Sequence, residues 1–395
     1  MPHTPRITVI GAGYAGLMAA LRLSKRVGSA AHITLVTASD TFQERIRFHQ
    51  ELAGTGRSQH PLSRFLSGTG IQLQVGRVMA IELPNHRVRL ADGRAMDYDR
   101  LVYALGSSTS LDGVPGAREH ALTVDQDDLH ALRARIEATA VRGGRLAVCG
   151  AGLTGIETAS ELAEAFPRLR VTLISGGHLS GQFSPDSMSH LVRAFERLHI
   201  SVEAGVVTSV GARSIVVGER TLPVAACLWA GGFQVPDLAR EAGLEVNKRG
   251  QIVTDEYLRS ASHPEVMACG DAAAPPVSCG AVYMACAAAV PMGATVADNV
   301  AAEIAGRALV VHGARPAGYC VSLGRRDGLI QGCTATGRPT RALATGWLGA
   351  QVKESVCRYG VRMLMLTKYW AGAYHWPHGN QARPLPSSSS RELAA

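Results

Sequence analysis

The sequence predicts an α/β protein that contains two similar strand–turn–helix units. The stretch RITVIGAGYAGLMAALRL, residues 6–23, places three glycines between an apolar strand and a helical pattern. RLAVCGAGLTGIETASELA, residues 145–163, repeats this arrangement. A GxGxxG motif between a strand and a helix is typical of a Rossmann-like dinucleotide-binding domain. We therefore expect two such domains with one dinucleotide in each; the alternative is a duplication in which one site has decayed.

Each glycine of the first unit has a physical role. Gly11 allows the tight turn, Gly13 lets the backbone approach a pyrophosphate, and Gly16 lets the helix pack closely on the strand. The helix N-terminus then offers free N–H groups to the phosphates. The next strand ends at Thr37, where an acidic residue usually binds the ribose hydroxyl. Here the ribose must bind a hydroxyl, the backbone or nearby polar groups.

The second unit repeats these roles with Gly150, Gly152 and Gly155. Its following strand ends at Ser175, again without an acidic residue. An acid at this place would repel the 2′-phosphate of NADP, so its absence permits NADP. No arginine follows, and only His178 is near. The choice between NADH and NADPH stays open.

Two further segments are expected to join the units. In residues 86–107, apolar and polar residues first alternate, a turn follows, and an apolar strand then ends at Gly106. Residues 266–274, VMACGDAAA, form a strand that ends in Gly270 and Asp271 before an alanine-rich helix. An aspartate in this position suits a sugar hydroxyl, and the helix dipole suits a partly anionic ring edge.

Composition restricts the class of protein. The chain has 395 residues, of which 46% are hydrophobic and 18% charged, and a net charge of +8. The positive charge is spread along the chain, so we expect no nucleic acid partner, whereas contact with an anionic membrane surface stays open. Residues 272–297 contain no charged side chain, but their prolines and glycines favour a loop and a buried helix over a membrane span.

The cysteines and the N-terminus indicate a cytoplasmic protein. No secretory signal is recognisable, because three glycines interrupt the first apolar stretch. Eight cysteines are spaced irregularly without a CxxC pair. We therefore expect reduced thiols and no metal site.

Taken together, the motifs resemble those of the two-dinucleotide-binding flavoproteins. Both glycine loops, LVYALGS (101–107), LWAGG (228–232) and ACGDAAA (268–274) occur in the order found in that group. The group includes the pyridine nucleotide–disulfide oxidoreductases, and the chain is most similar to type II NADH dehydrogenases over roughly residues 6–310. FQERIRFHQELAG (42–54) and SLGRRDGLIQG (322–332) look like a branch of FAD-dependent, NADH-dehydrogenase-like proteins.

The resemblance implies a glutathione-reductase-like architecture that binds FAD and either NADH or NADPH. It implies that hydride passes from the nicotinamide to flavin N5. The residues it implies for FAD are Gly11, Gly13, Tyr14, Ala15, Gly16, Thr37, Arg45, Ala104, Gly106, Gly270 and Asp271. Those for the nicotinamide cofactor are Gly150, Gly152, Gly155, Glu157, Ser175 and Gly232. The implied parts are 1–112 (FAD domain, first part), 113–239 (NAD(P)H domain), 240–310 (FAD domain, second part), 311–380 (C-terminal substrate or interface segment) and 381–395 (disordered tail).

Three departures from the family affect the expected reaction. The first cysteine is Cys149, so the redox cysteine pair that follows the first loop in disulfide reductases is absent. ACAAAVPMG, residues 285–293, lacks the glutamine of the quinone motif in type II dehydrogenases. The FxGxxxHxxxW signature of flavin monooxygenases is also missing. We therefore favour a small, flat organic acceptor over a membrane quinone.

Candidate catalytic residues near the flavin ring are Glu157, Arg45, His49 and Gln50; the alternative is that they make ordinary structural hydrogen bonds. Residues 351–370 are expected to form a helix that either lies on a membrane surface or packs on the protein. The aromatic run that follows includes Tyr374, His375 and Trp376. These rings either stack on a substrate or dock the C-terminus.

Three functions are compatible with the sequence. The first is an NAD(P)H-dependent flavoenzyme that acts on a small organic molecule. The second is a membrane-peripheral NADH:quinone oxidoreductase. The third is a flavoprotein whose nicotinamide-driven redox state governs binding to a partner. A homodimer is also left open, and the sequence does not identify the acceptor.

Overall fold

The structure is a computed structural model that describes residues 3–177, 179, 183–276, 284–313, 318–334 and 336–376. It confirms the predicted α/β fold with two parallel sheets. The tail predicted to be disordered, residues 381–395, lies outside the described residues, as does His178.

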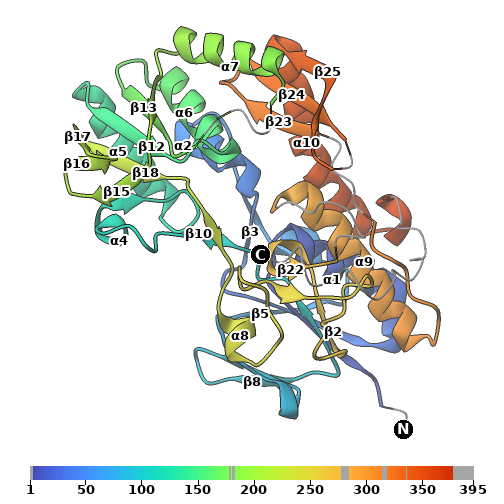
Figure 1. The fold of residues 1–395 in the computed structure, drawn as a ribbon. Helices are drawn as coiled ribbons and strands as arrows, with labels where there is room; N and C mark the ends of the chain where they lie inside the picture. The colour runs from blue at the N-terminus through green and yellow to red at the C-terminus, as the bar shows by residue number, and fades with distance from the viewer. Residues whose placement is uncertain are drawn as a thin grey trace, which may run out of the picture.

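The first sheet has five parallel strands in the order β21-β9-β1-β2-β5. The strands are β1 (Arg6–Ile10), β2 (His32–Thr37), β5 (Gln72–Val75), β9 (Arg100–Tyr103) and β21 (Val266–Ala268). Helices α1 (Tyr14–Val27) and α9 (Cys286–Ile304) pack side by side against it (Figure 1). Strand β21 belongs to the first sheet but follows all strands of the second sheet in sequence. The second sheet is therefore inserted into the chain of the first unit.

The second sheet also has five parallel strands, in the order β11-β18-β12-β13-β14. They are β11 (Ala121–Leu122), β12 (Arg145–Cys149), β13 (Arg170–Ser175), β14 (Ser201–Ala204) and β18 (Ala226–Trp229). Its helices are α5 (Leu129–Val141), α6 (Leu153–Ala165) and α7 (Pro185–Arg197). An antiparallel sheet of β15 (Val207–Val210), β16 (Ser214–Val217) and β17 (Arg220–Pro223) lies beside it (Figure 1).

Two short strands cross between the units. β10 (Ser108–Thr109) leads into the second unit and β19 (Phe233–Gln234) leads out, and the two pair antiparallel. Most of the remaining short elements belong to connections of the first sheet. They are β3 (Thr41–Gln43), α2 (Phe48–Ala53), β4 (Gln59–Pro61), α3 (Ser63–Leu66), β6 (Val78–Glu82), β7 (Arg87–Leu90), β8 (Ala95–Asp97), α8 (Leu238–Glu241), β20 (Ile252–Val253) and β22 (Ala273–Ala274). Helix α4 (Ala117–His120) instead contacts β15 in the second unit.

The C-terminal part forms an antiparallel sheet with one long helix. The sheet consists of β23 (Gly318–Ser322), β24 (Gly328–Cys333) and β25 (Pro339–Thr345). Helix α10 (Gly346–Thr367) packs on β24 so closely that a side chain at Gly349 would collide with the carbonyl group of Gly328. The helix begins before the predicted range 351–370, because Gly346 takes a positive φ of 66° and turns β25 directly into it. It ends earlier, at Thr367.

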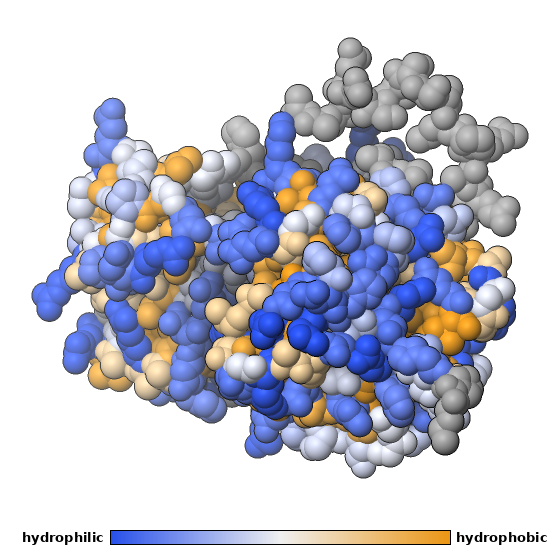
Figure 2. All heavy atoms as spheres, turned by 90° about the horizontal axis from the view of Figure 1, so that it is seen from below, coloured by the Kyte–Doolittle hydropathy of each residue, from blue (hydrophilic) through white to orange (hydrophobic). Residues whose placement is uncertain are grey.

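The last part of the charge-free segment 272–297, from Cys286 on, forms the start of the largely buried helix α9, as predicted. Residues 277–283 of the segment are not described. In the described part of the chain, no helix combines the length and apolarity needed to cross a bilayer. Seen from below, polar and charged residues cover most of the surface, and hydrophobic residues form separate patches between them (Figure 2).

Candidate functional site

The first glycine loop forms a cradle that only glycine permits. Gly11 has a φ of 100°, and a Cβ there would collide with the Ala104 carbonyl oxygen. A Cβ on Gly16 would collide with the carbonyl oxygen of Gly11. By contrast, nothing lies within 4 Å of a Cβ placed on Gly13, so this glycine faces open space. Gly11 and Gly16 therefore allow β1, α1 and β9 to pack closely, whereas Gly13 leaves room for a ligand.

The second loop has the same geometry. Gly150 has a φ of 114°, and a Cβ there would lie 2.7 Å from the backbone nitrogen of Gly231. Gly155 packs against the carbonyl of Gly150, and Gly152 again faces open space. Neither α1 nor α6 has a side-chain cap at its N-terminus, so first-turn N–H groups remain for phosphate oxygens. Both loops therefore fit the pyrophosphate of a dinucleotide.

Asp271 lies at the edge of the first cradle. Its Oδ2 accepts a 2.6 Å hydrogen bond from the Ser107 hydroxyl, and the amide of Gln251 holds its backbone carbonyl at 2.8 Å. Among the described residues nothing donates to Oδ1, which leaves this atom for a ligand hydroxyl. Gly106 and Gly270 have φ values of 68° and 73°, so each turns the chain sharply at a strand end. This arrangement fits the sugar-alcohol part of FAD.

The predicted ribose positions carry no charge. Thr37 is half-buried, and its carbonyl accepts from the Gly76 amide at 2.8 Å. Ser175 is buried, and its hydroxyl donates to the Gly177 carbonyl within the turn that follows β13. The Ser175 hydroxyl is thus already occupied.

Tyr14, Ala15 and Gly232 have clear structural roles. The Tyr14 ring packs edge-on against Phe42 with centroids 5.1 Å apart. Ala15 lies where α9 crosses α1, and a side chain at Gly293 would collide with its carbonyl. Gly232 has a φ of 73° and accepts from the Ser110 amide at 3.2 Å. Their predicted cofactor contacts stay predictions.

Arg45 lies at the crossing between the two units. It donates to the Ser107 carbonyl and, at 3.0 Å, to Oδ2 of Asp125. Its guanidinium carbon lies 5.9 Å from the ring centroid of Phe233 on β19. Arg45 thus links the segment that follows β9 to the crossing strands.

Glu157 is part of a buried charge cluster that the fold assembles from three helices. Its Oε1 lies 2.6 Å from Nζ of Lys353 on α10 and accepts at 3.0 Å from the Ser322 amide. Its Oε2 lies 3.7 Å from Nδ1 of His49 on α2. Glu157, Lys353 and His49 are 6%, 7% and 3% exposed. Two predicted residues therefore meet around a lysine that sequence reasoning did not select.

Electrostatics fix the charges of this cluster. Burial lowers the pKa of His49 to about 4, against the opposing effect of Glu157, so the ring is neutral at pH 7. Burial alone would lower the pKa of Lys353, but the adjacent Glu157 carboxylate outweighs it and holds that pKa above its ordinary value. Burial raises the pKa of Glu157, yet the Lys353 ammonium and the hydrogen bond from the Ser322 amide bring it below its ordinary value. The cluster is an ion pair beside a neutral imidazole.

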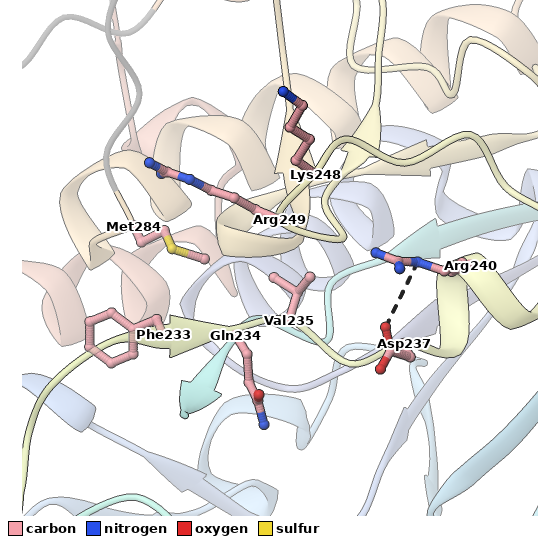
Figure 3. Close-up of a pocket in the computed structure, with 8 residues that line it drawn as sticks. All are labelled: Phe233, Gln234, Val235, Asp237, Arg240, Lys248, Arg249 and Met284. Atoms are coloured by element: carbon pink, nitrogen blue, oxygen red, sulfur yellow. Dashed lines mark ion pairs between the residues drawn. The ribbon is translucent and has the colours of Figure 1, made fainter. Parts of the chain in front are cut away.

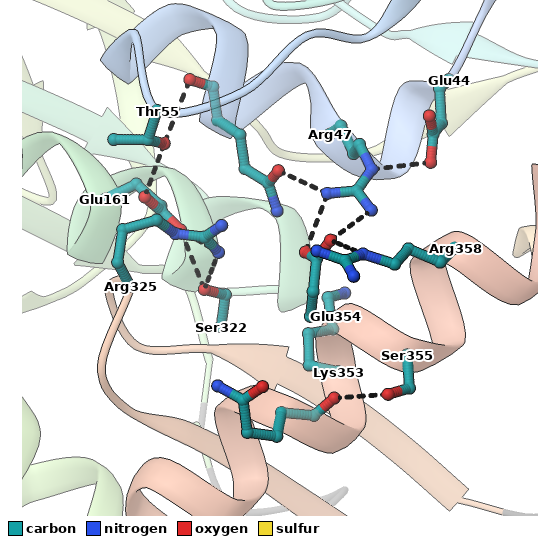
Figure 4. Close-up of polar contacts among 12 residues, drawn as sticks. Glu44, Arg47, Thr55, Glu161, Ser322, Arg325, Lys353, Glu354, Ser355 and Arg358 are labelled. Atoms are coloured by element: carbon teal, nitrogen blue, oxygen red, sulfur yellow. Dashed lines mark hydrogen bonds and ion pairs between the residues drawn. The ribbon is translucent and has the colours of Figure 1, made fainter.

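Gln50 is held by a second group of charges. Arg47 donates to its Oε1 at 2.7 Å, to Glu44 at 2.8 Å and to both carboxylate oxygens of Glu354 at 2.9 Å (Figure 4). The Gln50 amide nitrogen and His49 Nε2 are buried without a hydrogen-bond partner among the described residues. Two polar atoms on α2 are therefore left for a ligand or water.

The same face of α6 binds the C-terminal sheet at two further carboxylates. Glu161 accepts from the Ser322 hydroxyl and from Arg325 Nε, each at 2.9 Å, and from the Thr55 hydroxyl at 3.2 Å (Figure 4). Glu164 accepts from the Arg325 amide. Together with Glu157, these contacts attach α6 to β23 and the turn after it.

The aromatic run at the C-terminus lies against α1. Trp376 is 7% exposed, stacks on Tyr374 with centroids 5.8 Å apart, and lies 4.6 Å from the guanidinium of Arg22. Arg22 is itself buried, pairs with Asp298 at 2.7 Å and donates to the Tyr374 carbonyl at 3.1 Å. His375 is exposed. This is the docking arrangement, and a substrate contact by these rings stays a prediction.

The seven cysteines in the described part are all free; Cys279 lies outside it. Cys149 and Cys227 approach to 3.5 Å between their sulfur atoms on adjacent strands. Within the described ranges, no group of three or more His, Cys, Asp or Glu side chains could hold a metal ion.

Comparison with known proteins decides the family. The family model for pyridine nucleotide-disulphide oxidoreductases matches residues 5–297. The chain belongs to this family. Membership identifies it as an FAD-dependent NAD(P)H oxidoreductase and confirms the resemblance, the fold and the cofactors expected from the sequence.

Relatives and solved structures agree with this assignment. The chain is 31% identical over 294 residues to the NADH dehydrogenase-like protein Rv1812c of Mycobacterium tuberculosis, covering 68% of this chain and 73% of the relative. It is 27% identical over 301 residues to a type II NADH:quinone oxidoreductase of Staphylococcus epidermidis, covering 68% and 74%. NDH2 from Plasmodium falciparum, solved in complex with NADH, superposes with a TM-score of 0.76 at 14% identity, covering 94% of this chain and 99% of that one.

Proposed function

We propose that this enzyme uses NAD(P)H to reduce a small, flat organic carbonyl compound. When bound, FAD supplies the two-electron chemistry between nicotinamide and acceptor. The residues for it would be those of the first loop with Asp271, and the second loop would hold the nicotinamide cofactor. The observation that carries the proposal is the buried Lys353–Glu157 pair, which places a protonated amine where the FAD-side, nicotinamide-side and C-terminal helices meet.

Lys353 is suited to bind a carbonyl oxygen as a charged hydrogen-bond donor, because its raised pKa keeps the amine protonated. An ammonium group has three N–H donors. One points to Glu157 and a second donates to the Cys320 carbonyl at 3.3 Å, which leaves a third for an acceptor oxygen. Reduction of a carbonyl group to an alcohol consumes one hydride equivalent and one proton. The electrons come from NAD(P)H and the proton comes from solvent, while Lys353 stabilises the negative charge that develops on the acceptor oxygen.

Helix α6 connects the two halves of the reaction. Its N-terminus at Gly152 would bind the nicotinamide pyrophosphate, and Glu157 lies little more than one turn further along the same helix. His49 and Gln50 add neutral hydrogen-bonding groups from α2. The acceptor is therefore expected to carry oxygen atoms that accept hydrogen bonds, as a quinone nucleus does.

The test separates the two half-reactions. Anaerobic reduction by NADH and reoxidation by 2-methyl-1,4-naphthoquinone would be timed in Glu157→Gln/Lys353→Met, which removes both charges together. We expect near-normal reduction and reoxidation slower by about 100-fold, the usual cost of removing one preorganised donor to a developing oxyanion. Lys353→Arg keeps the charge and the N–H donors, so it should recover the structure and part of the rate. Normal reoxidation in Glu157→Gln/Lys353→Met would contradict the proposal.

A membrane quinone is a second candidate, favoured by the outer face of α10. Aromatic and leucine side chains follow this face over about 33 Å, the length of a 22-residue helix, and Trp347 and Trp370 near its ends are both 67% exposed. Arg358 and Arg362 lie between them, as on helices that bind anionic lipid surfaces. Faster turnover of long-chain quinone in anionic vesicles than of any water-soluble acceptor would favour this candidate.

A further inference from the structure

A cleft of about 500 Å³ lies beside the FAD-side residues and has no role in the function described so far. It is lined by Phe233, Gln234, Val235, Asp237, Arg240, Lys248, Arg249 and Met284 (Figure 3). The lining comes from the crossing strand β19, helix α8, the turn before β20 and the residues before α9. It therefore lies between the segment that leaves the nicotinamide unit and the second part of the FAD unit.

The cleft is close to the FAD cradle through two short connections. β19 pairs with β10, which directly follows Ser107, the residue that donates to Asp271. On the other side, Gln251 follows the Lys248–Gly250 turn closely and holds the Asp271 carbonyl. Both walls of the cleft are thus continuous with residues that position Asp271.

The cleft also borders the neighbourhood of Lys353. Met284 precedes Cys286 by two residues. Burial raises the pKa of the Cys286 thiol to about 11, and the charge of Lys353 acts against this shift, so lysine and thiol are within electrostatic reach.

The lining combines an apolar wall with excess positive charge. Phe233 is 44% exposed, and Figure 3 shows its ring on the same side of the cleft as Met284 and the guanidinium of Arg249. Arg240, Lys248 and Arg249 are exposed, and only Arg240 faces a lining carboxylate, that of Asp237 at 3.9 Å. Three cations and one carboxylate leave a net charge of +2. Among the described residues, Lys248 and Arg249 make no ion pair.

We propose that this cleft binds the anionic group of the acceptor, so that the preferred substrate is a flat ring bearing a carboxylate, sulfonate or similar group. Phe233 and Met284 contact the ring, and Lys248 and Arg249 bind the anion at the rim. Arg pairs well with planar oxyanions because its N–H donors match their geometry. This inference rests on the proposed function, since it assigns the class of acceptor for the same reaction.

The experiment compares two acceptors that share a nucleus: 1,4-naphthoquinone-2-sulfonate and neutral 2-methyl-1,4-naphthoquinone. Reoxidation of the NADH-reduced holoenzyme would be followed anaerobically in the wild type and in Lys248→Gln/Arg249→Gln. We expect the wild type to favour the sulfonate and the variant to lose about tenfold in kcat/KM for the sulfonate alone, as two rim charges would give. Reduction by NADH should change less than twofold.

The control removes the same net charge elsewhere. Arg142 and Arg168 are exposed in the nicotinamide unit, and Arg142→Gln/Arg168→Gln should keep the preference for the sulfonate. Loss of the preference in this control, slower reduction by NADH in the cleft variant, or equal use of both acceptors by the wild type would overturn the inference. Calorimetric binding of the sulfonate gives a readout without turnover. If wild type binds it through Lys248 and Arg249 but reduces neither quinone, the cleft assignment stands and the proposed function fails.

Discussion

Lys353 Nζ and Glu157 Oε1 lie 2.6 Å apart and join two parts of the chain that are almost 200 residues distant in sequence. The lysine belongs to the C-terminal helix and the glutamate to the helix of the second glycine loop. Both are nearly inaccessible to solvent. A pair in this setting is costly to break, because removal of one partner leaves the other charge buried and uncompensated.

Lys353→Met should therefore lower the free energy of unfolding by about 3–5 kcal/mol. Glu157→Gln/Lys353→Met should recover most of that loss, since neither charge is then buried alone. Arg358, which is exposed on the same helix, provides the matched control in Arg358→Met. Urea unfolding of the FAD-loaded proteins measures all three. An equal loss in the single and double variants would mean that packing, not charge, dominates.

Stability should fall as the pH decreases from about 6.5 to about 4. In this window the unfolded chain protonates His49 and His312, whereas burial lowers the pKa of each to about 4 in the folded protein. The unfolded state binds more protons, so stability rises with pH across the window. Each histidine contributes up to about 3 kcal/mol.

The measurement is urea unfolding at several pH values between 4.5 and 7.5. His312→Gln should flatten the dependence, and the exposed His130→Gln should not. A dependence that is unchanged in His312→Gln would show that this histidine is not buried in its neutral form.

Gly13→Val should abolish FAD retention without disturbing the protein fold. A Cβ at Gly13 meets no protein atom within 4 Å, so the effect of the substitution is expected to come through the ligand. The variant should match the wild-type apoprotein in its circular dichroism spectrum and its Tm, because bound FAD itself raises the Tm. Gly16→Val is the contrast, because a side chain there collides with the Gly11 carbonyl and should prevent folding.

Gly152→Val should leave FAD bound and slow its reduction by NADH at least tenfold. Gly152 also faces open space, but it lies in the second unit, away from the Asp271 edge. Anaerobic bleaching of the flavin absorbance measures the rate. Bleaching at the wild-type rate would place the nicotinamide cofactor elsewhere.

Trp376→Ala should destabilise the protein by about 3–5 kcal/mol, the usual cost of truncating a buried large aromatic side chain. The loss includes the contact of the ring with Arg22, a buried cation. Both half-reactions should proceed normally in the folded fraction if the ring only docks the chain end. A selective decrease in reoxidation would instead support the substrate contact predicted from the sequence.

The sequence predicts the fold well because the spacing of its glycines shows where the backbone turns tightly or packs too closely for a side chain. Gly11, Gly16, Gly150 and Gly155 are required by collisions that no other residue avoids, and such requirements are visible in a single chain. Lys353 was harder to recognise, because an isolated lysine in an amphipathic helix is usually exposed. A signal was present: Lys353 shares its helical face with Gly349, Cys357 and Leu364, all of which are buried.

The rest depends on contacts between segments far apart in sequence. His49 becomes a neutral buried ring only because α2 packs against α6 and α5, and no local pattern encodes that packing. From the sequence, the aromatic run near residue 376 could equally have formed a surface on which a substrate stacks. In the structure the run packs on Arg22, a buried charged residue of the helix that follows the first glycine loop. The sequence gives no sign that this arginine is buried.

The carboxylates along α6 have a mechanical consequence. Glu157, Glu161 and Glu164 attach the unit of the second sheet to the C-terminal part, while β10 and β19 connect it to the unit of the first sheet. Attachment at two separate places leaves rotation about the line that joins them as the one simple hinge motion of this unit. Movement of the nicotinamide cofactor relative to the flavin is therefore expected about that single axis rather than by unrestricted domain closure.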